Sequence, residues 1–442
     1  MKRIFAIVLS IIFLLLVIYN CKDEPPVVPP PPPPPHSVKD TLTLTFDYAT
    51  HRSIIINTKT TSYNKNSTIE LYRQFNNTDT LVTEYLITTN DTSIIDDNNS
   101  IGLEINTTYT YYAVRIDSTG ERKDSSNFIN ATTLAVTNFN YTWQEFALGE
   151  PGSVLYDVWG TDENNVYAVG RVELNDTVYG IIKWNGTAWL PEKKIGGLQA
   201  IYGFSTNDIW AVGGGVWHFN GFEWEEYTYR DPVITGSVTY YSVWGTSSSN
   251  LYMGSGGGKI IHWNGNDAQI VYKNPDQVFV KDLDGYSSDF IIGVGTGMVP
   301  PLLAVKYDGI SWTNLPISSN WSLNAASIGT KKQIYFGGDG VFEMIGTNFS
   351  RIQSFGYYIW DIKYNRQTGV TVASGAYDGI YINNGLEWSN YRGQISSDHT
   401  RYSGIFIDNN TIFCVGSTVN GAKIIIGKNL GKKYEGGEDR YE

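Results

Sequence analysis

The stretch VWGTSSSNLYMGSGGGKIIHWNG, residues 243–265, consists of three short apolar runs separated by glycine, serine and asparagine. A similar stretch, VWGTDENNVYAVG, occupies residues 158–170. Short runs of β-branched and aromatic residues bounded by such turn-forming residues predict β-strands joined by tight turns. The similarity of the two stretches indicates an internal repeat.

The repeat continues along the chain after residue 138. Its first strand recurs at residues 158–160, 201–203, 243–245, 283–285, 327–329, 362–364 and 405–407. Each copy is followed by a second strand ending in glycine and by a third strand, so the unit recurs about every forty residues. Five third strands end in Asn-Gly or Asp-Gly, which favours a tight hairpin into a fourth strand. The residues expected to anchor the fourth strands are Trp189, Trp224, Ile270, Trp312, Phe349 and Trp388.

A unit of three to four short strands at this period is typical of a β-propeller blade. The sequence contains seven sets of the first three strands but six downstream fourth strands. The segment YTWQEFAL at residues 141–148, with Trp143 as its anchor, fits the missing fourth strand. Pairing of this segment with the last blade would close the ring and remove an exposed sheet edge. We therefore predict a seven-bladed β-propeller over residues 138–430.

The repeat resembles those of propellers in secreted bacterial proteins, some of which are similar to sialidase or Kelch-like propellers. The sequence has neither the Asp-box set nor the arginine triad of sialidases. The resemblance therefore implies a fold and no activity.

A different pattern precedes the propeller, over residues 38–135. Seven short alternating runs separated by turn-forming residues predict an antiparallel β-sandwich. The runs are residues 42–48, 53–58, 68–75, 81–87, 92–96, 109–117 and 128–134. The text LEINTTYTYYAVRIDSTGERKDSSNFINATTL, residues 103–134, resembles the last strands of a fibronectin type III domain.

This resemblance implies roles for several residues of the sandwich. Leu103 and Tyr109 would form the tyrosine corner, and Tyr111 would face the core. The tryptophan usual in the second strand of that family is missing, and Ile54 and Ile56 occupy the stretch. The predicted fold class is thus all-β, a fibronectin type III-like β-sandwich followed by a seven-bladed β-propeller.

The N-terminus carries the features of an export signal. Lys2 and Arg3 precede an apolar run over residues 4–19, and Cys21 follows at once. This resembles the looser lipoprotein signal peptides of Bacteroidota-like bacteria, which implies lipidation at Cys21 after removal of residues 1–20. A retained single-span anchor is the alternative. The expected location is the bacterial outer membrane or cell surface, with the membrane reached only through the lipid anchor.

Composition limits the remaining possibilities. Proline dominates the linker at residues 21–37 and predicts an extended stalk, and a polar tail follows the propeller at residues 431–442. The net charge of -12 disfavours nucleic acid as a partner. Only two cysteines occur, so with Cys21 lipidated Cys414 has no disulfide partner, and we expect it to be buried.

Motifs for catalysis or metal binding are scarce. No HExxH, GxSxG, CxxC or P-loop pattern occurs. The acidic stretches at residues 96–99 and 162–165 are interpreted as turns, and GSGGG at residues 254–258 as a hairpin. His218 and His262 hold equivalent third-strand positions, which are interpreted as a solvated strand face. We expect no cofactor, no metal and no enzymatic activity.

Binding is better supported, because long unequal loops join each fourth strand to the next first strand. Aromatic residues in such loops can contact a protein or glycan ligand. The predicted ligand-binding residues are Tyr229, Tyr240, Trp321, Tyr357, Tyr358, His399 and Arg401. Trp159, Trp244 and Trp360 recur in or beside first strands and are instead expected to pack between blades.

Two alternatives to a binding protein remain open. Asp157, Asp282 and Asp361 hold similar positions in or just before first strands, so a glycan hydrolase or lyase using these carboxylates in a central channel is one. Close carboxylates with a raised pKa would favour that enzyme. A purely structural component of the cell envelope is the other.

Overall fold

The computed structural model describes residues 41–61, 66–228, 233–234, 238–296, 302–317, 321–395 and 398–431. The predicted signal peptide, Cys21, the linker, Tyr229 and nearly all of the C-terminal tail lie outside these residues. All regular elements of the described part are β-strands. Within that part there is no helix that has the length and apolar character needed to cross a membrane.

The N-terminal unit consists of two antiparallel sheets that face each other. One sheet has the order β1-β2-β5, with β1 (Leu42–Ala49), β2 (Ile54–Thr60) and β5 (Asp91–Asp96). The other has the order β4-β3-β6-β7, and β8 also pairs with β6. Its strands are β3 (Thr68–Phe75), β4 (Thr78–Leu86), β6 (Thr108–Ile116), β7 (Arg122–Ser125) and β8 (Ile129–Thr132).

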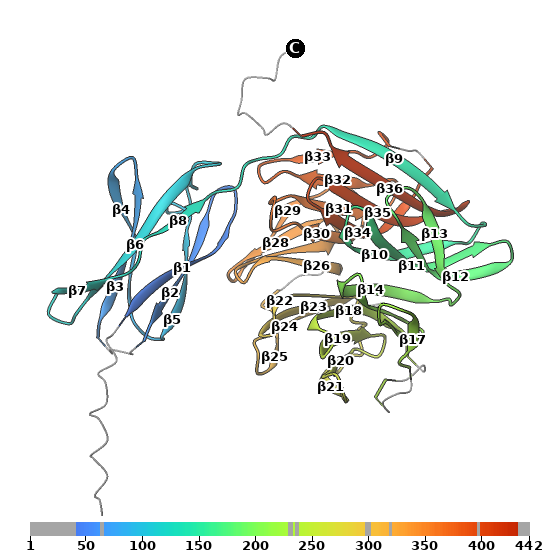
Figure 1. Cartoon of the computed structure of the whole chain (residues 1–442), viewed down its shortest axis with the longest axis horizontal. Coiled ribbons are helices and arrows are strands. Elements are labelled where there is room, and N and C mark those ends of the chain that lie inside the picture. The colour runs from blue at the N-terminus through green and yellow to red at the C-terminus, as the bar shows by residue number, and fades with distance from the viewer. Residues whose placement is uncertain are drawn as a thin grey trace, which may run out of the picture.

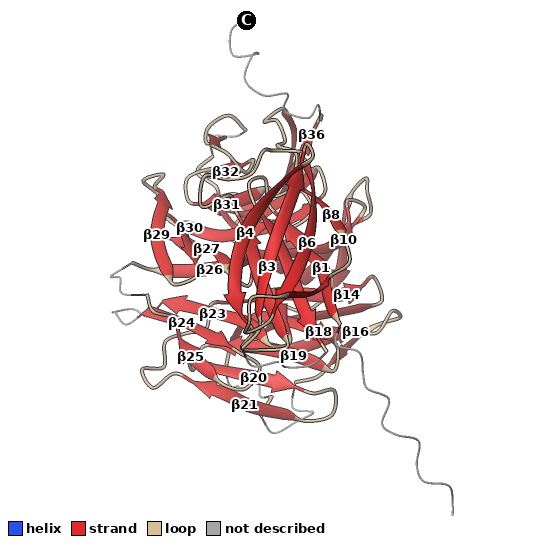
Figure 2. Cartoon of the chain, turned by 90° about the vertical axis from the view of Figure 1, so that its left-hand side faces the viewer, coloured by secondary structure: helices blue, strands red, loops and turns tan. Residues whose placement is uncertain are grey.

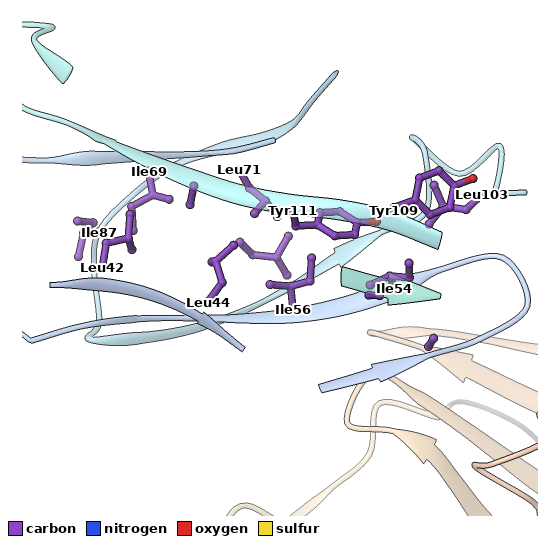
Figure 3. Packing of buried hydrophobic residues seen from close by; sticks show 14 residues of the cluster. Leu42, Leu44, Ile54, Ile56, Ile69, Leu71, Ile87, Leu103, Tyr109 and Tyr111 are labelled. Atoms are coloured by element: carbon purple, nitrogen blue, oxygen red, sulfur yellow. The ribbon is translucent and has the colours of Figure 1, made fainter. Parts of the chain in front are cut away.

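The core of this sandwich lies between the two sheets, where Figure 3 shows Leu44 and Ile56 of one sheet facing Leu71 of the other. Ile54 and Ile56 are fully buried, so β-branched side chains fill the second strand of the core. The backbone amide of Glu104 donates a hydrogen bond of 3.0 Å to the hydroxyl of Tyr109. This is the type of contact that the expected tyrosine corner requires.

The described residues after 140 form seven four-stranded antiparallel sheets, numbered here in chain order (Figure 1). Sheets one to three contain β10 (Val154–Asp162), β11 (Asn165–Leu174), β12 (Thr177–Trp184), β13 (Trp189–Lys193); β14 (Leu198–Ser205), β15 (Asp208–Gly213), β16 (Val216–Phe219), β17 (Trp224–Glu226); and β18 (Tyr240–Ser247), β19 (Asn250–Ser255), β20 (Lys259–Trp263), β21 (Ala268–Lys273).

Sheets four to six contain β22 (Asp282–Ser287), β23 (Phe290–Thr296), β24 (Leu302–Tyr307), β25 (Trp312–Asn314); β26 (Leu323–Thr330), β27 (Gln333–Gly338), β28 (Val341–Ile345), β29 (Asn348–Gln353); and β30 (Ile359–Tyr364), β31 (Thr371–Gly375), β32 (Ile380–Asn383), β33 (Trp388–Asn390). Sheet seven has the order β34-β35-β36-β9, with β34 (Arg401–Asp408), β35 (Thr411–Thr418), β36 (Gly421–Asn429) and β9 (Tyr141–Leu148).

The sheets form a closed ring. Each first strand contacts the first strand of the next sheet, and β34 contacts β10. β9 pairs with β36 over eight residue pairs, from Leu148 opposite Ala422 to Tyr141 opposite Asn429 (Figure 1). Trp143 lies against Gly427 of β36. The predicted closing strand is therefore confirmed, and the C-terminal unit is a β-propeller.

Aromatic side chains of the first strands pack against a glycine of the next sheet. Trp159 lies over Gly203, and Trp244 lies over Gly285. Phe406 of the last sheet lies over Gly160 of the first sheet, so the same kind of contact spans the closure. The recurring tryptophan and glycine of the repeat are thus complementary parts of the contact between blades, as expected for Trp159 and Trp244.

Replacing Gly285 by alanine is expected to destabilise the propeller by about 1–3 kcal/mol, because it overpacks this contact. A Cβ atom at Gly285 would lie 2.2 Å from Cζ2 of Trp244, whose side chain is buried. Urea denaturation followed by tryptophan fluorescence measures the change. Gly214→Ala is the control, since a Cβ there meets no atom within 4 Å. Equal midpoints for both variants would contradict the packing role.

Several local expectations hold and others need correction. Cys414 is fully buried, and GSGGG forms the turn between β19 and β20, as expected. Ile270 is 47% exposed and does not anchor its fourth strand, because Ala268 occupies the position opposite Trp263. The short alanine leaves that position without an aromatic signal in the sequence.

The third-strand histidines are not on a solvated face. His218 stacks on Trp210 with ring centroids 4.3 Å apart, and His262 stacks on Tyr252 at 4.5 Å. Lys183 places its ammonium 5.0 Å from the centre of the Tyr167 ring in the equivalent position. These side chains cover aromatic residues of the second strands, which explains why histidine and lysine alternate there.

The sandwich contacts the propeller where first strands turn into second strands. The Tyr286 hydroxyl donates a 2.9 Å hydrogen bond to Oδ1 of Asp47, and the Tyr48 hydroxyl contacts that of Tyr364. Figure 2 shows the sandwich in front of the ring of sheets. The opposite face, called the free face below, carries the connections from fourth strands to the next first strands.

Candidate functional site

The first strands of the seven sheets surround a central channel that contains a cavity of about 350 Å³. Residues of all seven first strands line this cavity, and several of them are consecutive in the sequence. The side chains that line it include Tyr156, Asp157, Trp159, Gln199, Tyr202, Tyr241, Trp244, Lys281, Asp282, Asp284, Asn324, Trp360, Asp361, Lys363, Arg401 and Ser403. Polar and aromatic residues thus share the wall of the channel.

Three aspartates join neighbouring sheets at the channel wall. Each carboxylate accepts one backbone amide from its own strand and one from the first strand of the next sheet. The donors are Val158 (2.8 Å) and Ile201 (2.9 Å) for Asp157, Leu283 (2.9 Å) and Ala326 (2.9 Å) for Asp282, and Ile362 (2.8 Å) and Ile405 (2.7 Å) for Asp361. The carboxylates therefore satisfy edge amides of the first strands.

One lysine compensates these carboxylates electrostatically. Lys363 places Nζ 3.5 Å from Oδ1 of Asp361, and the surrounding carboxylates raise the pKa of Lys363. Desolvation raises the pKa of Asp157, Asp282 and Asp361 to about 6 in each case. The positive charge of Lys363 lowers the pKa of each of the three aspartates, but desolvation raises it by more.

Cationic residues gather where the channel opens on the free face. The Arg401 guanidinium lies 3.7 Å from the centre of the Trp360 ring, and the Lys281 ammonium lies 4.2 Å from that of Tyr241. Burial and the nearby charge of Arg401 lower the pKa of Lys281, and burial lowers the pKa of Arg401. With Ser403, which lines the same cavity, these residues are called the mouth cluster.

Four of the predicted ligand-binding residues lie close to one another on sheets six and seven. The Tyr358 ring is 4.8 Å from that of Trp360, which in turn contacts Arg401. Tyr357 lies 5.3 Å from Tyr377, and Tyr377 lies 6.0 Å from His399.

A second arginine extends this group outward. The Arg392 guanidinium lies 3.9 Å from the centre of the Tyr357 ring. Tyr357, Tyr377, Arg392 and His399 are called the rim cluster. This cluster and the mouth cluster together form the candidate site.

The other predicted residues are placed differently. Trp321 is 43% exposed on the connection before β26, with the Arg351 guanidinium 4.8 Å from its ring, and it belongs to neither cluster. Tyr240 is fully buried in a hydrophobic cluster, so its assignment to the ligand-binding surface is wrong. Because neighbouring strand residues face opposite sides, the adjacent Tyr241 reaches the channel instead.

Lys281, Arg392 and Ser403 were not predicted, and Trp360 was interpreted only as packing. The repeat itself could have identified the channel residues. They occupy the position just before Asp157, Asp282 and Asp361, and the equivalent position in the other first strands. That position holds Tyr156, Gln199, Tyr241, Lys281, Asn324, Trp360 and Ser403 in the seven sheets.

The acidic turn near residue 162 has a structural explanation. Oδ1 of Asp162 accepts the backbone amide of Asn164 at 2.8 Å, as in other turns capped by an aspartate. Among the residues with described positions, no three His, Cys, Asp or Glu side chains are grouped so that they could hold a metal ion.

Comparisons with known proteins identify the fold. No family model and no curated protein matches the chain. A structure of YCF48 bound to a D1 peptide matches with a TM-score of 0.50 at 14% identity, over 68% of this chain and 100% of that chain.

Two further solved structures are similar. YCF48 from Cyanidioschyzon merolae matches with a TM-score of 0.48 at 14% identity, over 65% of this chain and 98% of its own. The WD40 β-propeller domain of Doa1 matches with a TM-score of 0.48 at 13% identity, over 67% of this chain and 99% of its own. At 14% identity, the similarity to the YCF48 structure with the D1 peptide is one of fold.

Proposed function

We propose that this chain is an exported, lipid-anchored binding protein whose propeller recognises a protein partner through its free face. The observation that carries the proposal is that the two faces of the propeller have different contacts. Sandwich residues such as Asp47 and Tyr48 contact one face, whereas the mouth and rim clusters lie on the other. Arginine, tryptophan and tyrosine, which dominate these clusters, are the residue types enriched in interface hot spots.

A protein partner is favoured over a glycan by a comparison with a structure that contains a bound peptide. That structure, YCF48 with a D1 peptide, shares the propeller fold and holds a peptide. The aromatic faces available for stacking on a sugar ring are also few, because Arg401 covers Trp360 and Arg392 covers Tyr357.

The upstream segments would present the propeller at a distance from the membrane. In this proposal residues 1–20 are a signal peptide, Cys21 carries the lipid, and residues 21–37 form the stalk. The sheet orders β1-β2-β5 and β4-β3-β6-β7 support a fibronectin type III-like spacer. Alkyne-labelled palmitate should label the chain in cells and should not label Cys21→Ser; labelling of both would refute the anchor.

Site-specific photo-cross-linking tests the binding face. A photoreactive residue at Tyr357 in cells that make the protein should yield an adduct of defined mass. The same residue at Lys59, which is exposed on β2 of the sandwich and lies away from the free face, should yield none. Absence of an adduct at Tyr357, or equal capture at both positions, would contradict the proposal.

A glycan-active enzyme is the second candidate, and the raised pKa of the three channel aspartates favours it. Both oxygens of each carboxylate already accept backbone amides, which gives these groups a structural role. We expect no release of reducing ends from a panel of polysaccharides. Release that is lost in Asp282→Asn would establish the enzyme and contradict a purely binding role.

A further inference from the structure

The mouth cluster is cationic in a chain with a net charge of -12. Lys281 and Arg401 lie close enough that the charge of Arg401 lowers the pKa of Lys281. Among the described residues no carboxylate forms an ion pair with either of them. Two like charges held together at the edge of a cavity repel each other, and a bound anion would remove that repulsion.

Two further groups of the cluster are hydrogen-bond donors without acceptors. Nε1 of Trp360 and Oγ of Ser403 are buried and have no hydrogen-bond partner in the described part of the chain. Buried polar atoms are nearly always paired in folded proteins, so such atoms beside a cavity mark a place for a ligand or water. The indole nitrogen can only donate, which selects an acceptor such as a carboxylate oxygen.

Negative charge on the deeper channel wall limits how far an anion can enter the channel. Asp157, Asp282 and Asp361 line the deeper wall and are compensated by the one ammonium of Lys363. A second anion there would meet these carboxylates at short range. The favourable position is therefore the mouth, between Lys281 and Arg401.

The cations continue from the mouth across the free face. Arg392 lies on Tyr357 of the rim cluster, and Arg351 lies on Trp321 of the neighbouring loop. A succession of cations held on aromatic rings suits an extended acidic ligand better than a single small anion.

We propose that the mouth cluster binds a side-chain carboxylate of an acidic segment of the protein partner, with Arg392 contacting the same segment. This inference rests on the proposed function and names the chemistry of its partner. A uronate-containing glycan is less suitable, because cations already occupy the ring faces of Tyr241 and Trp360.

Binding of a labelled octaglutamate peptide, capped at both ends, tests the inference. The capped ends restrict the probe to side-chain carboxylates, and an octaglutamine peptide is the uncharged comparison. The protein is the full chain with Cys21→Ala, and fluorescence anisotropy measures Kd. Octaglutamate should bind and octaglutamine should not, and the affinity should fall as salt is added.

Matched variants locate the site. Lys281→Gln/Arg401→Gln is expected to weaken octaglutamate binding at least about tenfold, since two charge-assisted contacts are lost. Lys59→Gln/Lys123→Gln removes the same charge from exposed positions on the sandwich and should leave Kd unchanged. Near-UV circular dichroism verifies that both variants are folded.

Three results would overturn the inference. These are equal binding of the two peptides, unchanged affinity in the mouth variant, or binding of polygalacturonate without binding of octaglutamate. If octaglutamate fails to bind while the photoreactive residue at Tyr357 still captures a partner, the inference falls and the proposed function stands. If octaglutamate binds and Tyr357 captures nothing, the mouth is an anion site and the proposed function falls.

Discussion

A propeller that lacks β9 is expected to lose at least about 5 kcal/mol of stability, a large part of what a domain of this kind has. A chain of residues 150–431 lacks the strand, whereas a chain of residues 138–431 retains it. Loss of β9 removes eight residue pairs from the ladder and exposes the apolar side of β36, including Ile424 and Ile426.

The shorter chain should also aggregate, because β36 becomes a free edge. Thermal denaturation and size-exclusion chromatography of the two chains measure both effects. Both chains lack the sandwich, so the comparison isolates the strand. Equal melting temperatures and a monomeric shorter chain would contradict the closure.

Asp361→Ala is expected to lower the free energy of unfolding by about 2 kcal/mol at pH 7, because two backbone amides lose their acceptor. Those amides belong to Ile362 in the same strand and to Ile405 in the next sheet. Alanine fits the position, since Ala200 and Ala325 occupy it in sheets two and five. The loss of stability in Asp361→Ala should therefore come from the two lost hydrogen bonds. Urea denaturation at pH 7 measures the free energy of unfolding.

The same variant has an expected pH dependence. The pKa of Asp361 is about 6 in the folded chain, above its ordinary value of 3.8, so the folded state binds the proton more tightly. This group therefore contributes stability that is fully present below pH 3.8 and is lost as the pH rises through 6. The difference between wild type and Asp361→Ala should be larger at pH 4 than at pH 7, by on the order of 2 kcal/mol. A difference that shrinks toward pH 4 would contradict the raised pKa.

The fold was predictable because the repeat encodes contacts between neighbouring sheets. The Trp-Gly pair of β10 shows this: Trp159 lies over Gly203 of the next sheet, and Gly160 lies under Phe406 of the preceding sheet. The closing strand was predictable from the missing fourth strand and Trp143. Ile270 was misassigned because apolar character does not reveal which side of an edge strand faces the neighbour.

The candidate site was predictable only in part. Loop position and residue type identified Tyr357, Tyr358, His399 and Arg401, which do lie close together. Lys281 was missed because its role depends on Arg401, which lies far away in the sequence and near it only in the closed ring.

Tyr240 and the channel aspartates show the same limit. Alternation along β18 buries Tyr240 and directs Tyr241 to the channel, a difference of one residue in register. The aspartates were predicted to converge on the channel, but their second hydrogen bonds, each to the next sheet, have no signal in the local sequence.

Disulfide trapping of β9 against β36 tests the closed ring most directly. Thr142 and Lys428 are exposed partners in the ladder, so cysteines at these positions should be close enough to form a disulfide. With Cys21 replaced by alanine and Cys414 buried, mild oxidation of Thr142→Cys/Lys428→Cys should yield the linked peptide pair by mass spectrometry. Thr142→Cys/Asn420→Cys should stay reduced, because Asn420 lies in the turn before β36, at the end opposite Lys428. A reduced first variant, or equal cross-linking of both, would show that β9 does not complete the last sheet.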